Sequence, residues 1–223
     1  MMIDLVIFDC DGVLVDSEAI SSEVLIDVLS HIGIELTPEF VRQNCLGRSF
    51  PTVAASIRAR ADRALPDDFE ERYRRRLFKR YETDLKVTPG LKSVLSRLVV
   101  PCCVATSSSP PRVGRTLHMT GLSSFFGDRV FTASQVARGK PAPDLFLLAA
   151  ERMVADPART LVIEDSGPGL AAGFAAGMQV ALYAGGSHLI GADLTDWEDI
   201  DILGSWADFP PELLSSYPTG TIQ

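Results

Sequence analysis

The stretch I-D-L-V-I-F-D-C-D-G-V-L-V-D, residues 3–16, decides how the rest of the chain is interpreted. Its short apolar run, Leu5 to Phe8, stops at two acids and a glycine, which is typical of a buried strand in a parallel sheet. Asp9 and Asp11 would then lie just beyond the carboxyl end of that strand, where open α/β sheets bind their ligands. Two carboxylates this close repel each other unless a cation or a shared proton lies between them. The stretch therefore predicts a metal site.

The composition is that of a folded globular protein whose main partner is neither nucleic acid nor a membrane. The 223 residues are 46% hydrophobic and have a formal net charge of −8 at pH 7. This negative charge disfavours nucleic acid and anionic membrane surfaces, although a local cation would still attract a small anionic substrate. No apolar stretch approaches the roughly 20 residues that a membrane-spanning helix needs.

The N-terminus and the cysteines predict a cytoplasmic protein. Met1 leads directly into the first strand pattern, with Asp4 inside it, so no signal peptide is visible. The cysteines form no C-x-x-C pair, and the adjacent two would point to opposite faces of a strand. We expect the chain to act as a monomer. Four cysteines are expected to be small, reduced core residues: Cys10, Cys45, Cys102 and Cys103.

From Pro89 the chain alternates strand and helix patterns, and an all-helical segment lies between the first strand and this region. Within that segment, helices are expected at residues 17–32, with Ser17 as N-cap, at 51–63 and at 67–82, and a further helix starts at Thr37. Strands are then expected at 102–106, 129–131, 161–163 and 180–183, with helices between them. This alternation predicts an α/β fold with a doubly wound parallel sheet. Residues 1–15 and 86–223 would form the core domain, and residues 16–85 an inserted helical cap domain.

Polar side chains follow the strand patterns at places that a parallel sheet would bring to one edge. Taken singly, each group is a common turn or capping pattern. Together they meet the needs of phosphoryl transfer: a carboxylate nucleophile, hydroxyl and lysine donors for phosphate oxygens, and a divalent cation between carboxylates. Oxygen ligands favour Mg²⁺ over zinc. The groups are Asp9 with Asp11, the run Thr106 to Ser109, Lys140, and Glu164 with Asp165.

Four segments, D-C-D-G-V-L-V-D-S-E, V-A-T-S-S-S, G-K-P-A-P-D-L-F and V-I-E-D-S-G-P-G, resemble in order and spacing the motifs of the haloacid dehalogenase superfamily. The likeness covers roughly residues 1–185. It is greatest to the magnesium-dependent phosphatases of the β-phosphoglucomutase-like group, which have a helical cap after the first motif. The resemblance implies a haloacid dehalogenase-like, Rossmannoid core.

The resemblance also implies a role for each matched residue. Asp9 would be the nucleophile that forms an aspartyl phosphate. Asp11 would be the general acid for the leaving oxygen and then the base that activates water. Three residues would hold the phosphoryl oxygens: Thr106, Ser107 and Lys140. Four would bind Mg²⁺, the second of them through its backbone carbonyl: Asp9, Asp11, Glu164 and Asp165.

Two departures from the mutase relatives concern the substrate. Ser21 stands where those relatives have a histidine that helps hold the acid–base aspartate, and Phe50 stands where they have a cap arginine for a second phosphate. Arg48 is close enough to replace that arginine, with an ordinary surface charge as an even alternative. Arg75 or Arg76, in a dense helical charge run, is a weaker substrate candidate. These losses favour a phosphatase over a mutase.

The sequence thus predicts a Mg²⁺-dependent phosphatase of a small phosphorylated metabolite, with sugar phosphates as the first expectation and a cap that closes over the substrate. A phosphomutase is the nearest alternative, and a phospho-accepting signalling module is a distant one. A dehalogenase is disfavoured because that branch lacks the equivalent of Asp11 and needs no metal. His188, in G-G-S-H, is interpreted as a surface-loop histidine.

Overall fold

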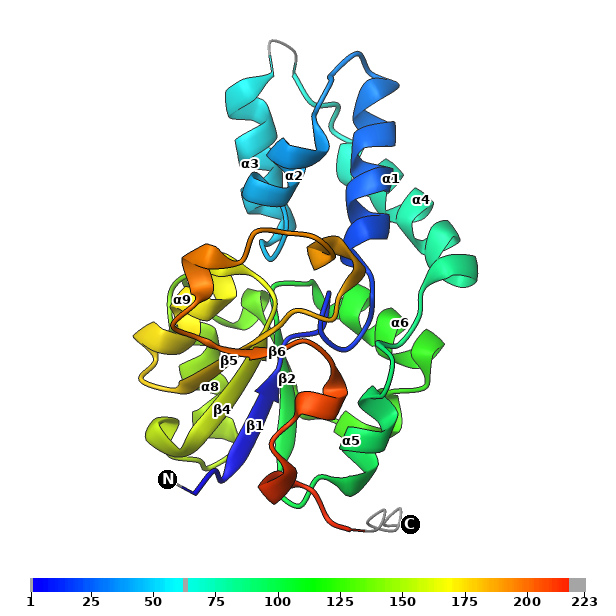
Figure 1. The fold of residues 1–223 in the computed structure, drawn as a ribbon. Helices are drawn as coiled ribbons and strands as arrows, with labels where there is room; N and C mark the ends of the chain where they lie inside the picture. The colour runs from blue at the N-terminus through cyan, green and yellow to red at the C-terminus, as the bar shows by residue number, and fades with distance from the viewer. Residues whose placement is uncertain (1, 62–63, 217–223) are drawn as a thin grey trace.

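Six parallel strands form one sheet in the computed structural model, which describes residues 2–61 and 64–216. The strands are β1 (Leu5–Phe8), β2 (Cys102–Thr106), β3 (Val130–Thr132), β4 (Thr160–Glu164), β5 (Gln179–Tyr183) and β6 (Asp201–Leu203). Their order is β3-β2-β1-β4-β5-β6, so β1 lies inside the sheet and the strand order reverses beside it (Figure 1). The predicted doubly wound parallel sheet is confirmed.

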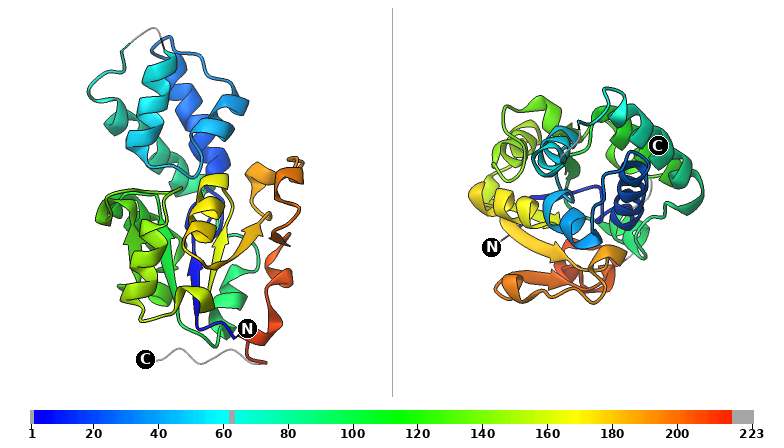
Figure 2. Two further views of the ribbon diagram at one scale, coloured as in Figure 1. Left: turned by 90° about the vertical axis from the view of Figure 1, so that its left-hand side faces the viewer. Right: turned by 90° about the horizontal axis from the view of Figure 1, so that it is seen from above.

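Two helical layers cover the sheet (Figure 2). Alternate side chains of β1 pack into one layer or the other. One layer holds α5 (Leu91–Arg97), α6 (Pro110–Thr120) and α7 (Ser123–Phe126), and the other holds α8 (Asp144–Arg152) and α9 (Gly167–Ala175). Val6 packs with the first layer and Leu5 with the second. The adjacent Cys102 and Cys103 divide between the same layers, as predicted. Of the described helices, none is long and apolar enough to cross a membrane.

Four helices lie above the sheet edge and share a hydrophobic cluster of their own (Figure 1). They are α1 (Glu18–Ser30), α2 (Pro38–Asn44), α3 (Phe50–Arg60) and α4 (Phe69–Asp84). We call these helices the cap. The chain enters and leaves the cap side by side, since Val15 pairs with Val87 and the Asp16 amide donates to the Lys86 carbonyl at 2.9 Å. The division into two domains at residues 16 and 85 stays a prediction.

The segment after β5 returns to the core through a strand that the sequence did not reveal. β6 is three residues long and pairs with β5, so it lacks the apolar run by which longer strands are recognised. Trp206 follows it and is buried against the Tyr183 ring, with ring centroids 4.5 Å apart. Its indole N–H donates to the Thr88 hydroxyl at 2.8 Å. The tail therefore belongs to the core and not only to the sheet edge.

Candidate active site

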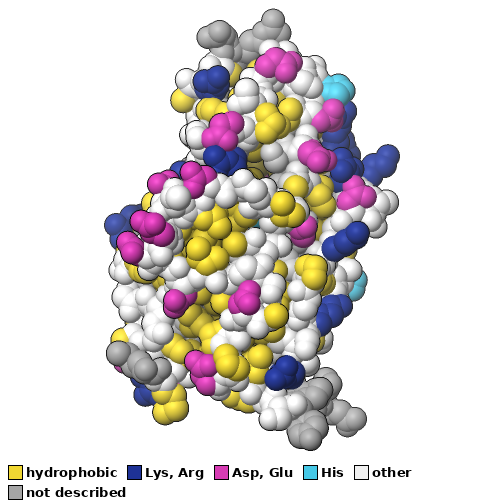
Figure 3. Space-filling view, in the orientation of Figure 1, with side chains coloured by type: hydrophobic (Ala, Val, Ile, Leu, Met, Phe, Trp, Pro, Cys, Tyr) yellow, Lys and Arg dark blue, Asp and Glu magenta, His cyan; other side chains and the backbone are white. Residues whose placement is uncertain are grey.

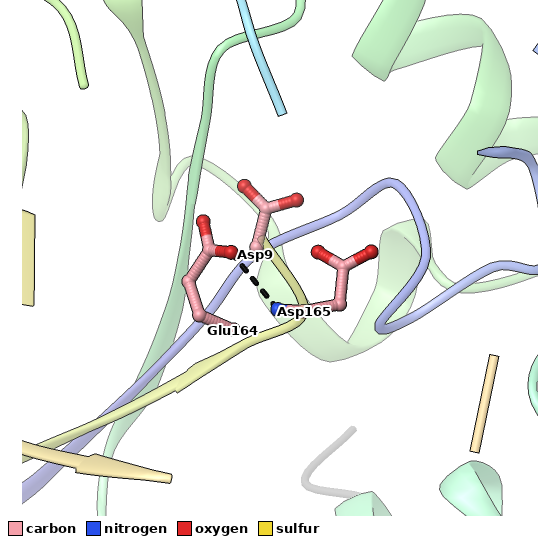
Figure 4. Close-up of side chains that lie close together, drawn as sticks. All are labelled: Asp9, Glu164 and Asp165. Atoms are coloured by element: carbon pink, nitrogen blue, oxygen red, sulfur yellow. Dashed lines mark hydrogen bonds between the residues drawn. The ribbon is translucent and has the colours of Figure 1, made fainter. Parts of the chain in front are cut away.

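Three buried carboxylates meet at the carboxyl ends of β1 and β4, which are neighbouring strands (Figure 4). Asp9 follows β1, and Glu164 and Asp165 come at the end of β4. Carboxylate oxygens of the three residues all lie within 4.8 Å of one another. The Asp9 amide donates to the Ile163 carbonyl at 2.9 Å, which continues the pairing of the two strands up to the site. The structure thus brings together the acids that the sequence placed at one edge.

Lys140 reaches the same cluster from the loop before α8. Its Nζ donates to Asp9 Oδ1 at 2.5 Å, to Glu164 Oε1 at 2.6 Å and to the Ala105 carbonyl at 3.0 Å. Burial by itself would lower the pKa of the Lys140 ammonium, but the charges of Asp9 and Glu164 raise that pKa above its ordinary value. Lys140 is therefore a fixed positive charge beside the predicted nucleophile.

The acid cluster fits a divalent cation on its own electrostatics. Burial raises the pKa of Asp9 well above its usual value, with Lys140 opposing this and the charges of Glu164 and Asp165 adding to it. Burial also raises the pKa of Asp165, to about 6, against the pull of His188. A bound cation would lower the cost of keeping these acids ionised together. Because every donor is an oxygen, a hard cation suits the site better than zinc.

Two neighbours fix the shape of this cluster. The second oxygen of Glu164, Oε2, accepts hydrogen bonds of 2.9 Å from the Asp165 amide and from the amide and hydroxyl of Ser166. Figure 4 shows the first of these bonds. Gly12 has a positive φ of 81°, and a Cβ at this position would lie 1.8 Å from Asp165 Oδ2. A side chain at residue 12 is therefore excluded by both the backbone and the acid.

The Asp11 carboxylate lies apart from the cluster and is held on both of its oxygens. Ser17 Oγ donates to Oδ1 at 2.7 Å, Ser108 Oγ donates to Oδ2 at 2.5 Å, and Arg112 Nη2 donates to Oδ1 at 2.8 Å. Burial opposes ionisation, but the Arg112 charge and these hydrogen bonds prevail and lower the pKa of Asp11. Ser17 is the N-cap residue of α1, as predicted, but its hydroxyl donates to Asp11 and makes no capping bond to the helix.

Arg112 is the site residue that sequence reasoning missed. It lies in the first turn of α6 and is mostly buried, with 18% of its side chain exposed. Besides Asp11, its Nη2 contacts the Ser21 hydroxyl at 3.1 Å and the Tyr81 hydroxyl at 3.0 Å, both in the cap. The available signal was an arginine four residues beyond Ser108, on a helix that starts at the carboxyl end of β2.

The interpretation of His188 as a surface-loop histidine is wrong. Its Nε2 lies 2.9 Å from Asp165 Oδ2, and only 7% of its side chain is exposed. The loop after β5 bends over the loop after β1, where the Ser187 amide and hydroxyl donate to Asp16 at 3.0 and 2.7 Å. Since β5 ends at the same sheet edge as β1 and β4, residues just after it also reach the site.

The predicted phosphate-binding residues line the cavity above Asp9. Thr106 is almost fully buried at the end of β2, and its hydroxyl accepts from the Ser108 amide at 3.0 Å. Ser107 donates through its hydroxyl to the Gly47 carbonyl of the cap at 3.0 Å. A cavity of about 50 Å³ lies against Asp9 and Thr106, and a wider one of about 460 Å³, which Lys140 lines, adjoins it. Together they leave room for a small molecule.

Of the cap arginines, Arg48 lines both cavities, and its buried Nε has no hydrogen-bond partner among the described residues. The Arg75 and Arg76 candidates are wrong. Arg75 is 3.9 Å from Glu71 with 70% of its side chain exposed, and Arg76 pairs with Asp27. Figure 3 shows basic side chains gathered along the side of the molecule where Figure 1 places α4. The neighbouring Arg74 instead faces inward and donates to Ser109 Oγ at 2.6 Å.

Glu18 is a buried acid at the first turn of α1 that lines the inner cavity. Its Oε1 accepts from the Gly47 amide at 3.3 Å. Burial, reinforced by the charges of Asp11 and Asp165, raises the pKa of Glu18 to about 7. Glu18 and the loop at Gly47 thus close the cavity from the cap side.

Comparisons with known proteins agree with this geometry. The model of the haloacid dehalogenase-like hydrolases matches residues 3–177. The 6-phosphogluconate phosphatase of Escherichia coli is 28% identical over 187 residues, which are 83% of this chain and 85% of that protein. The fructose-1-phosphate phosphatase of the same organism is 34% identical over 179 residues, covering 77% and 92%. A haloacid dehalogenase-like protein of unknown function from Agrobacterium tumefaciens superposes with a TM-score of 0.78 at 34% identity, covering 94% and 97%.

Proposed function

Because the chain belongs to the haloacid dehalogenase-like hydrolases and is a phosphatase, we propose that it hydrolyses a small phosphorylated metabolite, with sugar phosphates as the first candidates. The carrying observation is that Asp9 and Asp11 line one small cavity, while Lys140 lines the adjoining cavity and contacts Asp9. The relatives named above as phosphatases act, by their names, on 6-phosphogluconate and fructose 1-phosphate, which are both small phosphorylated carbohydrates.

In the proposed first step, an Asp9 carboxylate oxygen attacks phosphorus and the bond from phosphorus to the leaving oxygen breaks. Asp11 gives its proton to that oxygen, so the product leaves as an alcohol. In the second step, Asp11 takes a proton from water, whose oxygen attacks the aspartyl phosphate. The bond from Asp9 to phosphorus breaks, phosphate leaves, and both carboxyl groups return to their starting states.

The surrounding residues would bind and stabilise the transferring group. Lys140, at hydrogen-bond distance from Asp9, neutralises charge that builds up around phosphorus. The hydroxyl of Thr106 and the amide of Ser107 would hold phosphoryl oxygens. When bound, Mg²⁺ would supply further charge neutralisation. Four residues would hold it, the second through its backbone carbonyl: Asp9, Asp11, Glu164 and Asp165.

Arg48 is the candidate for selecting the substrate. Its buried Nε has no partner in the described part of the chain, and a second anionic group of a substrate would satisfy this donor. The phosphatase is favoured over the mutase because Ser21 and Phe50 replace the two cap residues of the mutase relatives.

Four free, buried thiols support a reducing, cytoplasmic setting. The expected monomer would be checked by light scattering.

A phosphate-release screen over sugar phosphates and nucleotides, with and without Mg²⁺, tests the proposal. We expect sugar phosphates to turn over in Mg²⁺ without a bisphosphate primer. Asp9→Asn should abolish turnover, whereas Asp128→Asn, an exposed acid remote from the site, should not. Activity that needs a primer and releases little phosphate would favour the mutase, and substantial turnover by Asp9→Asn would refute the nucleophile.

A further inference from the structure

Arg112 connects the acid–base residue to the cap through one nitrogen atom. Nη2 carries two hydrogens and has three acceptors within 3.1 Å: Asp11 Oδ1, the Ser21 hydroxyl and the Tyr81 hydroxyl. The two hydroxyls are 3.2 Å apart and hydrogen-bonded to each other. One N–H therefore points to Asp11, while the other is shared by the hydroxyl pair. Ser21 lies on α1 and Tyr81 on α4, so both ends of the cap contact the guanidinium.

The partners of Asp11 differ in what they can do with a proton. Arg112 only donates hydrogen bonds and keeps its proton at any pH that a protein survives. The Oδ1 atom that it contacts is therefore held as an acceptor. Oδ2 contacts the Ser108 hydroxyl at 2.5 Å, and a hydroxyl can rotate and accept instead. A proton on Oδ2 therefore leaves the hydrogen bond from Arg112 to Oδ1 in place, whereas a proton on Oδ1 would compete with it.

We propose that Arg112 is the positioning residue of Asp11. Its hydrogen bond keeps Oδ1 as an acceptor, so the proton that Asp11 donates and later accepts is carried on Oδ2. Because Ser21 and Tyr81 also contact Arg112, this arrangement depends on the position of the cap. Ser21, which stands at the histidine position of the mutase relatives, contributes its small side chain and hydroxyl to the place that the guanidinium occupies. The inference rests on the proposed role of Asp11 as general acid.

Three aryl and benzyl esters of similar size separate this role from phosphate binding or folding. Benzyl phosphate has a strongly basic leaving oxygen, phenyl phosphate a weaker one, and p-nitrophenyl phosphate leaves without much help from an acid. The constant kcat/KM reports steps up to the first irreversible one, and so isolates the protonation of the leaving group. The decrease in kcat/KM caused by losing a positioned acid should therefore be larger for the ester with the more basic leaving oxygen.

For Arg112→Ala we expect kcat/KM to fall about 100-fold on benzyl phosphate, within the range of general acid catalysis, and only about threefold on p-nitrophenyl phosphate. Added guanidinium should restore part of the loss on benzyl phosphate. Tyr81→Phe keeps the packed ring and should show a smaller loss with the same dependence on the ester. If Arg112→Ala does not fold, the Tyr81→Phe variant alone tests whether Arg112 positions Asp11.

Arg115→Ala is the matched control. Arg115 lies on the same helix, donates to Glu82 of α4 at 2.9 Å and stacks over Phe78, so its contacts with described residues lie outside the site. Its removal breaks a link between cap and core without touching Asp11. We expect equal kcat/KM ratios for Arg115→Ala and the unchanged protein on all three esters, and no effect of guanidinium.

An equal loss on all three esters for Arg112→Ala, or no loss, would overturn the proposal. So would a Tyr81→Phe variant without any dependence on the ester. Asp11→Asn separates this failure from that of the proposed function, because it should lose benzyl phosphate turnover most steeply. If Asp11→Asn shows that pattern and the Arg112 variants do not, the general acid stands and Arg112 is not its positioning residue.

Discussion

At the scale of single residues, the site depends on side chains fixed by hydrogen bonds and on the absence of a side chain at Gly12. Both Asp11 oxygens are occupied, and Lys140 spans Asp9 and Glu164. Gly12 leaves the space into which Asp165 extends. A close approach of this kind cannot be compensated by rotating a flexible side chain, because the acid is buried and bound to His188.

Gly12→Ala should therefore damage the site directly. The new methyl would overlap Asp165 Oδ2, and the positive φ adds strain of about 1 kcal/mol. We expect turnover of p-nitrophenyl phosphate to fall by more than tenfold and the melting temperature to drop. Gly114→Ala, at a position inside α6 where a methyl meets nothing within 4 Å, should leave turnover unchanged and should not lower the melting temperature. Full activity of Gly12→Ala would show that Asp165 has no fixed place.

The buried Glu18 predicts a stability that depends on pH. Its pKa is about 7 in the folded protein and near 4.5 when unfolded, so the folded protein binds more protons between these values and loses stability as pH rises through them. Above pH 7 the cost is about 3 kcal/mol. Glu18→Gln should remove it. In urea unfolding without metal, the gain over the unchanged protein should be near zero at pH 4.5 and largest at pH 8. A gain independent of pH would contradict this origin.

At the scale of elements, strands with an apolar run could be predicted, including the three-residue β3, whereas β6 could not. The strand at Leu5–Phe8, the β2 run and the helices beside them have clear apolar periods. The three-residue β6 has no such signal, because its place is fixed by pairing with β5. Tertiary contacts also explain which site residues the sequence did not reveal. Motif residues were visible in sequence, whereas Arg112 and His188 became site residues only through helix α6 and a loop folded across another strand end.

The returning tail predicts a difference between the two tryptophans. Trp206 is buried beside Tyr183 and Phe209, so Trp206→Ala should lower the free energy of unfolding by about 3–5 kcal/mol. Trp197 is only half-buried, and Trp197→Ala should cost clearly less. Urea unfolding followed by circular dichroism measures both. A loss for Trp206→Ala as small as the loss for Trp197→Ala would mean that the end of the tail is not an integral part of the core.

At the scale of the whole molecule, a protein with a net charge of −8 concentrates buried acids where an anionic substrate is expected. The molecule as a whole therefore repels its substrate, and the attraction must be local. Lys140, Arg48 and Arg112 supply part of it from three separate elements around the cavities. A divalent cation would supply the rest.

Adding Mg²⁺ should accordingly stabilise the folded protein. An ion that binds only the folded state at 100 times its Kd contributes about 3 kcal/mol. We expect the melting temperature to rise with Mg²⁺ in the millimolar range and to return after chelation. Asp165→Asn should abolish most of this rise, whereas Asp193→Asn, an exposed acid, should retain it. A rise of the same size in both variants would place the ion elsewhere.

The chain enters and leaves the cap at the paired residues Val15 and Val87, and this has a consequence for the evolution of such a protein. Because the inserted segment begins and ends at paired residues, its length and content do not alter the distance between β1 and the chain that leads to β2. The cap is therefore exchangeable in principle. A different insert joined at the same two points would be placed over the same core site residues and would bring its own substrate selectivity. The exceptions are Ser17, which lies inside the exchanged segment and donates to Asp11, and Arg112, whose two cap hydroxyls would have to be supplied anew.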